Sequence, residues 1–218
     1  MIPSNLRPCL LDCLDAIAPQ VDRIWVVNTT DEDLASMEGF SEHRWPDTYI
    51  TELHVAKPGP NISYWWNCGL VDIAHEYQGA KKWDVAILND DAIVPEGWFD
   101  VVSGTMRTMQ VAASCSGGQG PMPVLQTVPG PVGIQNRLQG FAFILAGELG
   151  LRANEDIRWH FSDDYIDYES RKLGGMVMVP GYHVQHLYAD QQVSPEMAIM
   201  CAEDAQKFHD LYNGAMPW

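Results

Sequence analysis

The sequence lacks the features that would place it in a membrane or mark it for secretion. No apolar run approaches the roughly 20 residues that a membrane helix needs, and the longest one, residues 141–146 (FAFILA), suits a core segment of a folded domain. The N-terminus reads MIPSNLR, without a charged region followed by an apolar stretch, so we predict no signal peptide. These absences favour a cytoplasmic protein with no membrane segment.

Cysteine and positive charge are also scarce. The five cysteines are odd in number and show no C-x-x-C spacing, which predicts thiols in a reducing compartment rather than a disulfide framework or a zinc site. Thirteen basic residues stand against 29 acidic ones, a formal net charge of −16. That charge opposes general attraction to nucleic-acid backbones or anionic membranes. An anionic ligand would need a metal ion or helix N-termini as its counter-charge.

What the chain has in quantity is apolar residues arranged as alternating strands and helices. At 218 residues and 46% hydrophobic content, it can bury one proper core and is predicted to form one domain. The alternation predicts an α/β fold with a mostly parallel central sheet flanked by helices. Expected helices cover residues 6–17, 63–77, 95–109, 163–173 (with Ser162 as N-cap and Gly174 as terminator) and 194–214, and expected strands cover residues 21–27, 85–88, 140–145 and 176–179.

Residues 115–135 break this alternation. The segment holds five glycines and four prolines without a periodic pattern. Loops of this length are either disordered or functional, and we expect a lid or acceptor-side loop here, with plain disorder as the alternative.

Residues 85–91 (VAILNDD) are the most informative stretch. A buried strand runs into an amide and two adjacent carboxylates, Asp90 and Asp91, and paired acids raise each other's pKa unless a cation is present. Mg²⁺ and Mn²⁺ are held by one or two carboxylates together with substrate phosphates. The segment therefore indicates a metal site, and the alternative is a solvated turn after a strand.

Two further groups of residues carry possible chemistry. Asp163 and Asp164 fall in the first turn of a predicted helix, where the helix dipole keeps a carboxylate ionised and able to accept a proton. Acids are common at helix starts for the same electrostatic reason, which is the alternative reading. His186 follows a strand and could complete a carboxylate shell around Mn²⁺. His183 and His186 lack the glutamate and spacing of the helical zinc signature, so a zinc hydrolase is a weak interpretation.

In their order, these segments resemble the family 2 glycosyltransferases, which have the GT-A nucleotide-sugar-binding fold, and the resemblance covers most of the chain. The matches are residues 2–7 (I-P-S-N-L-R) to an opening I-P-T-x-x-R, residues 26–31 to a second strand and acidic turn, and residues 61 and 67–69 to paired N-x-G segments. Residues 88–91 match the L-N-D-D form of the D-x-D motif, residues 163–174 match E-D-x-D-L-x-x-R-x-x-x-G, and residues 179–186 match V-P-x-x-x-V-x-H. Departures are a first strand reduced to residues 1–2, Asp163 in place of a glutamate, and Trp66 in place of an arginine.

The resemblance implies a metal-dependent, inverting transferase that uses a nucleotide-sugar, most often a UDP-sugar. Direct displacement would invert the anomeric carbon, with Asp164 as general base. The implied Mn²⁺ or Mg²⁺ ligands are Asp91 and His186; the implied nucleotide-binding residues are Pro3, Ser4, Asn28, Asp31, Asn61 and Asp90; and the expected acceptor-binding residues are Trp159, Gly140 and Asp163.

The sequence leaves the acceptor and the oligomeric state open. A saccharide, a protein, a small molecule or a modified nucleobase each offers a hydroxyl. Within a single GT-A domain, we expect a nucleotide-sugar and metal half (residues 1–112), a Gly/Pro-rich loop (residues 113–137) and an acceptor half (residues 138–218). The alternatives are a nucleotidyltransferase of the same fold, which would usually show a glycine-rich loop and a lysine near the N-terminus, and a non-catalytic nucleotide- or sugar-binding module.

Overall fold

The computed structural model describes residues 1–56, 59–118, 120–130, 134–188 and 194–212. Its strands are β1 (Ile2–Ser4), β2 (Arg23–Asn28), β3 (Tyr49–His54), β4 (Asp84–Leu88), β5 (Ala92–Ile93), β6 (Ala113–Ser116), β7 (Val124–Gln126), β8 (Ala142–Ala146), β9 (Met176–Val179) and β10 (Gln185–His186). Its α-helices are α1 (Cys9–Ile17), α2 (Ile62–Glu76), α3 (Trp98–Met109), α4 (Ser162–Lys172) and α5 (Pro195–Leu211), with short 3-10 turns between several of them.

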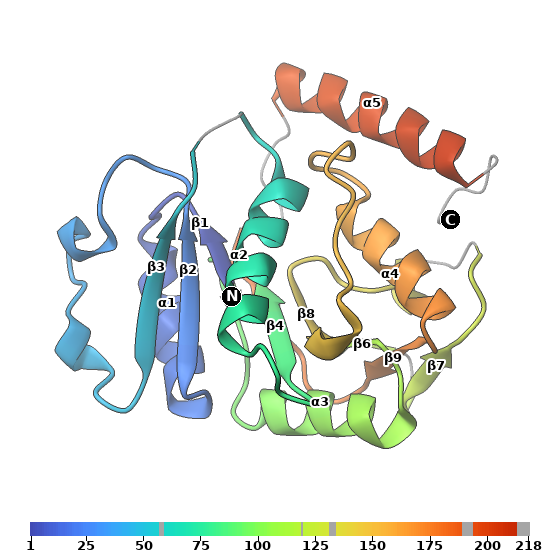
Figure 1. The fold of residues 1–218 in the computed structure, drawn as a ribbon, viewed down its shortest axis with the longest axis horizontal. Helices are drawn as coiled ribbons and strands as arrows, with labels where there is room; N and C mark the ends of the chain where they lie inside the picture. The colour runs from blue at the N-terminus through green and yellow to red at the C-terminus, as the bar shows by residue number, and fades with distance from the viewer. Residues whose placement is uncertain (57–58, 119, 131–133, 189–193, 213–218) are drawn as a thin grey trace.

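Apart from β5 and β10, which pair only with each other, the strands form a central sheet in two hydrogen-bonded parts (Figure 1). In the first part, β1, β2 and β3 pair in parallel. The second part has the order β4-β8-β6-β9-β7, and only its β6–β9 pair is parallel. Backbone bonds at Met1 join the parts, since its amino group donates to the Ala86 carbonyl (2.8 Å) and its carbonyl accepts from Leu88 N–H (3.1 Å). The α/β class is confirmed, with parallel pairing around β1 and mixed pairing beyond β4.

Alternating side chains of the strands build one apolar core on each face of the sheet. In β2, Ile24 and Val26 pack with α1 and α3, whereas Trp25 and Val27 pack with α2. Successive side chains of a strand point to opposite faces, so a strand that is apolar throughout must be covered on both sides. A third, small cluster joins Ile157, Phe161 and Phe208, where α5 meets the segment before α4.

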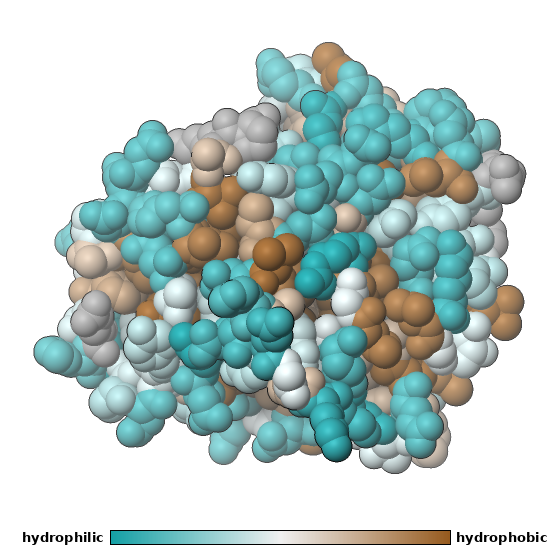
Figure 2. Space-filling view, in the orientation of Figure 1, coloured by the Kyte–Doolittle hydropathy of each residue, from teal (hydrophilic) through white to brown (hydrophobic). Residues whose placement is uncertain are grey.

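The surface is mainly hydrophilic, in keeping with the charge of the chain. Figure 2 shows polar side chains over most of one face, with apolar ones in separate patches. Among the described residues, no helix is both long enough and apolar enough to cross a membrane. The five cysteines are all free, and three of them are buried.

Most predicted helices agree with the structure to within a few residues. α1 begins at Cys9 rather than at residue 6, because Leu6 has a φ of 58°, outside the helical region. Ser194 caps α5 as predicted, accepting from Met197 N–H at 3.2 Å. The predicted cap of α4 was wrong: Phe161, with a φ of 68°, occupies the N-cap position, and the Ser162 hydroxyl bonds to the Ile157 carbonyl instead. The predicted end of α5 at residues 213–214 lies outside the described residues.

The sequence suggested that the Gly/Pro-rich segment 115–135 is a loop throughout, but part of it forms strands. It contains the end of β6 and all of β7, which pairs antiparallel with β9 at the edge of the sheet. Its glycines form the connection, with Gly117 and Gly118 at φ values of 136° and 87° that other residues rarely adopt. The lid hypothesis stays a prediction, and residues 119 and 131–133 lie outside the described part of the chain.

Candidate functional site

A cavity of about 650 Å³ lies where the carboxyl ends of β1 and β4 meet the N-termini of α2 and α4. This volume is within the range of small-molecule sites, and the carboxyl ends of strands are where open α/β sheets bind ligands. Residues from seven separate stretches of the chain line it, between Pro3 and Tyr188. Of the sequence-predicted site residues, the cavity brings together Pro3, Ser4, Asp90, Asp91, Gly140, Trp159, Asp163, Asp164 and His186.

Asp90 is held by two side chains from the start of the chain. The Ser4 hydroxyl donates to its Oδ2 at 2.8 Å, and Arg7 Nε donates to the same oxygen at 3.3 Å. Arg7 Nη2 also pairs with Asp90 Oδ1, and the carboxylate raises the pKa of the guanidinium. Both oxygens of Asp90 are therefore already engaged within the protein.

Asp91 is buried and keeps one carboxylate oxygen without a hydrogen bond. Its Oδ1 is enclosed and has no well-aligned hydrogen-bond donor, although His186 Nε2 lies 3.2 Å away. Burial acts to raise the pKa of Asp91, but His186 and Arg7 (Nη2 to Oδ2, 3.5 Å) outweigh it, so the pKa lies below its usual value. A buried, ionised oxygen facing an imidazole nitrogen is a suitable pair of cation ligands.

His186 reaches this place through the short pairing of β10 with β5. His186 lies opposite Ala92, the residue after Asp91, and Leu187 N–H donates to the Asp91 carbonyl at 3.0 Å. The imidazole stacks on Phe141, with ring centroids 4.7 Å apart. His183 is exposed and does not line the cavity, so the two histidines form no metal-binding pair there.

Asp164 lines the same cavity from the first turn of α4. Only 6% of the residue is exposed, and Arg137 Nη1 contacts its Oδ1 at 2.7 Å. Burial, followed by repulsion from Asp163, raises the pKa of Asp164 to about 8, and Arg137 acts against that rise. The sequence-based expectation considered only the helix start, whereas burial and Asp163 act in the opposite direction and favour the protonated form of Asp164.

Gly140 allows Asp163 to lie directly against the backbone. A Cβ at position 140 would come within 2.7 Å of Asp163 Oδ2 and 2.9 Å of its Cβ. A larger residue at position 140 would therefore displace Asp163, the neighbour of Asp164.

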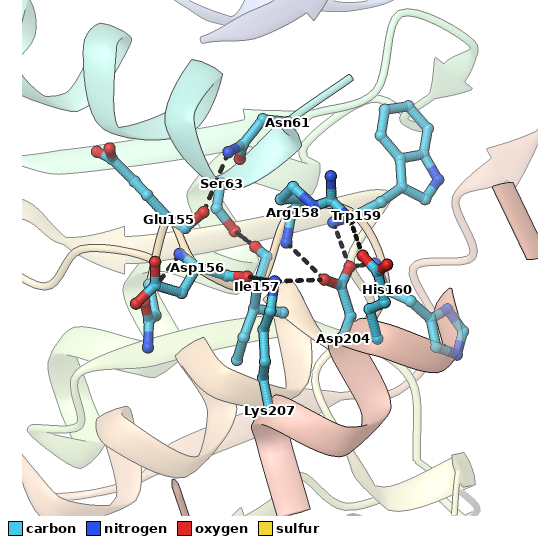
Figure 3. A network of polar contacts seen from close by, with 12 residues as sticks. Asn61, Ser63, Glu155, Asp156, Ile157, Arg158, Trp159, His160, Asp204 and Lys207 are labelled. Carbon is cyan, nitrogen blue, oxygen red and sulfur yellow. Dashed lines mark hydrogen bonds and ion pairs between the residues drawn. The ribbon is translucent and has the colours of Figure 1, made fainter. Parts of the chain in front are cut away.

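An aromatic wall closes the cavity beside α4. Trp65 and Trp159 meet edge to face, with centroids 6.0 Å apart, and 37% of Trp159 is exposed. Trp159 belongs to an irregular segment held between α2 and α5, and Figure 3 shows the polar contacts that hold it. Such rings can stack on the apolar face of a sugar.

Three predicted nucleotide-pocket residues do not line the cavity. Asn28 is buried and bonds to Glu52 and the Glu32 carbonyl. Asn61 is the N-cap of α2, accepting from Tyr64 N–H at 2.9 Å. Asp31 is exposed in the turn after β2.

Sequence reasoning missed the two arginines of the cavity. Arg7 belongs to the opening I-P-S-N-L-R match but was given no role, and Arg137 lies at the end of the Gly/Pro-rich segment, where no pattern marked it. Both arginines pair with buried carboxylates, Arg7 with Asp90 and Arg137 with Asp164. The need of a buried carboxylate for a positive partner is the physical signal that could have pointed to them.

A second group in the described part of the chain could hold a metal ion. Asp33, Glu52 and His54 each offer one ligand atom within 4.8 Å of the others. It does not line the cavity, and Glu52 already accepts from Leu34 N–H and the Asn28 amide.

Comparisons with known proteins support the fold. No family model and no curated protein matches the sequence. Among solved structures, S. aureus TarS 1–349 aligns over 96% of this chain and 70% of its own, with a TM-score of 0.57 and 12% identity. The same TarS fragment in complex with UDP-GlcNAc aligns with a TM-score of 0.52, at 14% identity over 98% of this chain and 70% of its own. GalNAc-T7 with UDP, GalNAc and Mn²⁺ aligns over 97% of this chain with a TM-score of 0.63 and 12% identity.

This chain spans 48% of the GalNAc-T7 chain and 42% of a longer TarS chain. Both neighbours are GT-A glycosyltransferases, so the chain described here has the GT-A fold.

Proposed function

We propose that this chain is a metal-dependent glycosyltransferase that moves a sugar from a UDP-sugar to an acceptor hydroxyl with inversion. One observation carries the proposal: a cation-type pair, Asp91 with His186, and a buried carboxylate, Asp164, face one cavity. The GT-A neighbours solved with UDP, UDP-GlcNAc or Mn²⁺ support the same donor class.

Asp91 and His186 would hold a Mn²⁺ or Mg²⁺ ion. The donor set fits, because the Asp91 Oδ1 is buried without a hydrogen bond and the nearby imidazole nitrogen is a borderline ligand that suits Mn²⁺. Two protein ligands leave coordination positions for diphosphate oxygens, as is usual for these ions. When bound, the ion supplies Lewis-acid stabilisation of the negative charge on the departing diphosphate.

Asp164 would act as the general base. Its deprotonated form accepts the proton of an acceptor hydroxyl while that oxygen attacks the anomeric carbon from the side opposite the diphosphate. Arg137 holds the carboxylate by its contact to Oδ1 and favours its charged form. Direct displacement by this route inverts the anomeric carbon.

The remaining wall residues would orient the two substrates. Pro3 and Ser4, at the end of β1, would contact the nucleotide beside Asp90, whereas Trp159, Gly140 and Asp163 would form the acceptor side. A role for Asp31 in nucleotide binding stays a prediction. Asn28 and Asn61 lie outside the cavity lining, and a part for them in nucleotide binding likewise stays a prediction.

We propose the same division for the chain as a whole. Residues 1–112 would form the nucleotide-sugar and metal half, residues 138–218 the acceptor half, and residues 113–137 the connection. His186 would be the one metal ligand contributed by the second half. The cavity supports this division, because its lining residues come from both halves, with Arg137 at the end of the connection.

A donor-consumption assay with purified protein tests the proposal. UDP-sugars and Mn²⁺ are supplied, and UDP release is measured by mass spectrometry. We expect Asp91→Asn and Asp164→Asn to lose turnover, while Glu96→Gln and Glu169→Gln, matched carboxylate changes near each site but outside the cavity, retain it. A protein that binds UDP but never consumes a donor would be a binding module. Pyrophosphate release from a nucleoside triphosphate and a sugar phosphate would favour the nucleotidyltransferase.

A further inference from the structure

The irregular segment 154–160 carries the aromatic wall of the cavity and leads into α4. Trp159 and His160 line the cavity, and Phe161 then turns the chain into the first turn, with Asp163 and Asp164. A segment without regular structure cannot satisfy its own backbone, so its N–H and C=O groups need partners elsewhere. The position of this wall therefore depends on those partners.

The N-terminus of α2 binds the carbonyl groups of the segment (Figure 3). The Asn61 amide donates to the Glu155 carbonyl at 3.1 Å, and the Ser63 hydroxyl donates to the Ile157 carbonyl at 2.5 Å. The backbone N–H of Ile62 donates to the carbonyl of Arg158 at 2.6 Å. The first N–H groups of a helix have no partner within it, so this end of α2 is suited to that task.

Asp204 of α5 binds the amide groups of the same segment. Its Oδ1 accepts from the N–H of Arg158 at 3.1 Å, and its Oδ2 accepts from the N–H groups of Trp159 and His160 at 2.7 and 3.0 Å. Figure 3 shows the carboxylate directed at these three consecutive amides. The residue is fully buried, although α5 lies at the outside of the molecule. One carboxylate that accepts from three consecutive backbone amides fixes three successive residues.

α5 itself lies outside the cavity. The structure describes all of α5, and none of its residues is among those that line the cavity. Its fully buried apolar contact is Phe208, which clusters with Ile157 of the segment and with Phe161 just after it, the two phenyl ring centroids lying 5.5 Å apart. Lys207 lies 3.8 Å from Asp204 and bonds to the Asp156 carbonyl, but its side chain is 39% exposed. Asp204 is thus the buried polar link between α5 and the cavity wall.

We propose that Asp204 is a positioning residue that sets the acceptor side of the cavity from α5. This inference rests on the proposed function for its catalytic consequence. Ser4, Asp91 and His186 belong to other elements, so the loss of Asp204 displaces Trp159, His160 and the start of α4 while donor binding persists.

Two substitutions at Asp204 form a graded series. Asp204→Asn keeps the size and one acceptor oxygen, which can still serve Trp159 and His160, but its amide group opposes the N–H of Arg158. Asp204→Ala removes all three contacts. The control is Glu203→Gln, which removes a carboxylate from the same helix, paired with the side chain of Arg158 rather than with backbone amides.

Three measurements are made at a temperature where each variant is folded: hydrogen exchange of segment 156–164, UDP affinity with Mn²⁺ by calorimetry, and UDP-GlcNAc hydrolysis with water as acceptor. We expect faster exchange in the order wild type, Asp204→Asn, Asp204→Ala, and UDP affinity within about twofold of wild type. Since a displacement of about 1 Å costs on the order of 100-fold in rate, hydrolysis should fall about tenfold in Asp204→Asn and about 100-fold in Asp204→Ala. Glu203→Gln should match the wild type in all three.

The outcomes separate the two proposals. Unchanged exchange in Asp204→Ala, or unchanged hydrolysis despite faster exchange, overturns the positioning role. A UDP affinity that falls in parallel with hydrolysis also overturns it, because the effect then extends to the whole cavity. A wild-type protein that neither binds UDP nor hydrolyses the donor overturns the proposed function, and the exchange data alone then decide whether Asp204 holds the wall.

Discussion

Turnover should depend on pH through Asp164. Burial raises the pKa of this carboxyl to about 8, so at pH 7 about one tenth of the molecules carry the deprotonated base, about half at pH 8 and about nine tenths at pH 9. We therefore expect kcat for donor hydrolysis to rise about tenfold between pH 7 and pH 9 and then level off. The measurement is initial-rate kinetics with saturating UDP-GlcNAc and Mn²⁺.

Arg137 provides the second half of this experiment. Its guanidinium lies 2.7 Å from Asp164 Oδ1 and favours the charged form, and a nearby opposite charge typically lowers a carboxyl pKa by about 1–3 units. Arg137→Gln should therefore move the pH profile upward by that amount, lowering kcat at pH 7 by about 10- to 1000-fold. Arg44→Gln, which removes the same charge from a surface pair with Asp15, serves as the control. A profile that is flat from pH 6 to pH 9 in the wild type would refute the assignment of Asp164 as base.

The same pKa has a consequence for stability. The pKa of Asp164 is about 8 in the folded protein and about 4 in the unfolded chain. Between these two pH values the folded protein therefore keeps a proton that the unfolded chain has already released. The contribution of Asp164 to the free energy of unfolding is therefore lost as pH rises through this window. Asp164→Asn should be more stable relative to wild type at pH 8 than at pH 5, as measured by urea denaturation. An equal difference at both pH values would contradict the raised pKa.

The other predictions concern the metal site and the sheet. UDP should raise the melting temperature of the wild type only when Mn²⁺ is present. At a UDP concentration of 100 times Kd, binding adds about 2.7 kcal/mol to the stability of the folded state. An Asp91→Asn protein that keeps the full metal-dependent shift would exclude Asp91 as a metal ligand. Arg7→Gln leaves Asp90 without its counter-charge and should lower the free energy of unfolding by about 1–3 kcal/mol. Mn²⁺ alone should restore part of this stability, and an equal loss with and without Mn²⁺ would count against this reasoning. Gly69→Ala should cost about 1–3 kcal/mol in urea denaturation, because the new Cβ would lie 2.1 Å from Met1 Sδ, and unchanged stability would show that Met1 moves aside.

The sequence predicted the elements whose apolar patterns are strong. β4 and α2 were found within one or two residues, because β4 is a nearly continuous buried apolar run and the buried residues of α2 recur every three or four positions. β3 was missed because its side chains are half-buried or exposed, which leaves no apolar alternation to detect. β7 was missed because it is a three-residue edge strand between prolines and glycines.

The site was predictable only where motifs mark it. Asp91, Asp164 and His186 occur in short segments that resemble known ones, and the structure brings them to one cavity. Arg137 and Asp204 act through contacts across 27 and 44–46 positions, and no local pattern encodes such a distance. The raised pKa of Asp164 likewise depends on burial, which a helix-start pattern does not report.

The peripheral position of α5 has a consequence for how such a domain can diversify. The two large cores on the faces of the sheet include no residue of α5, which contacts the cavity wall through Asp204 and Phe208. Sequence change in the exposed turns of α5 thus leaves the donor machinery and both cores intact. Changes to α5 that alter the contacts of Asp204 would therefore act on the acceptor side of the cavity without touching the residues that hold the donor.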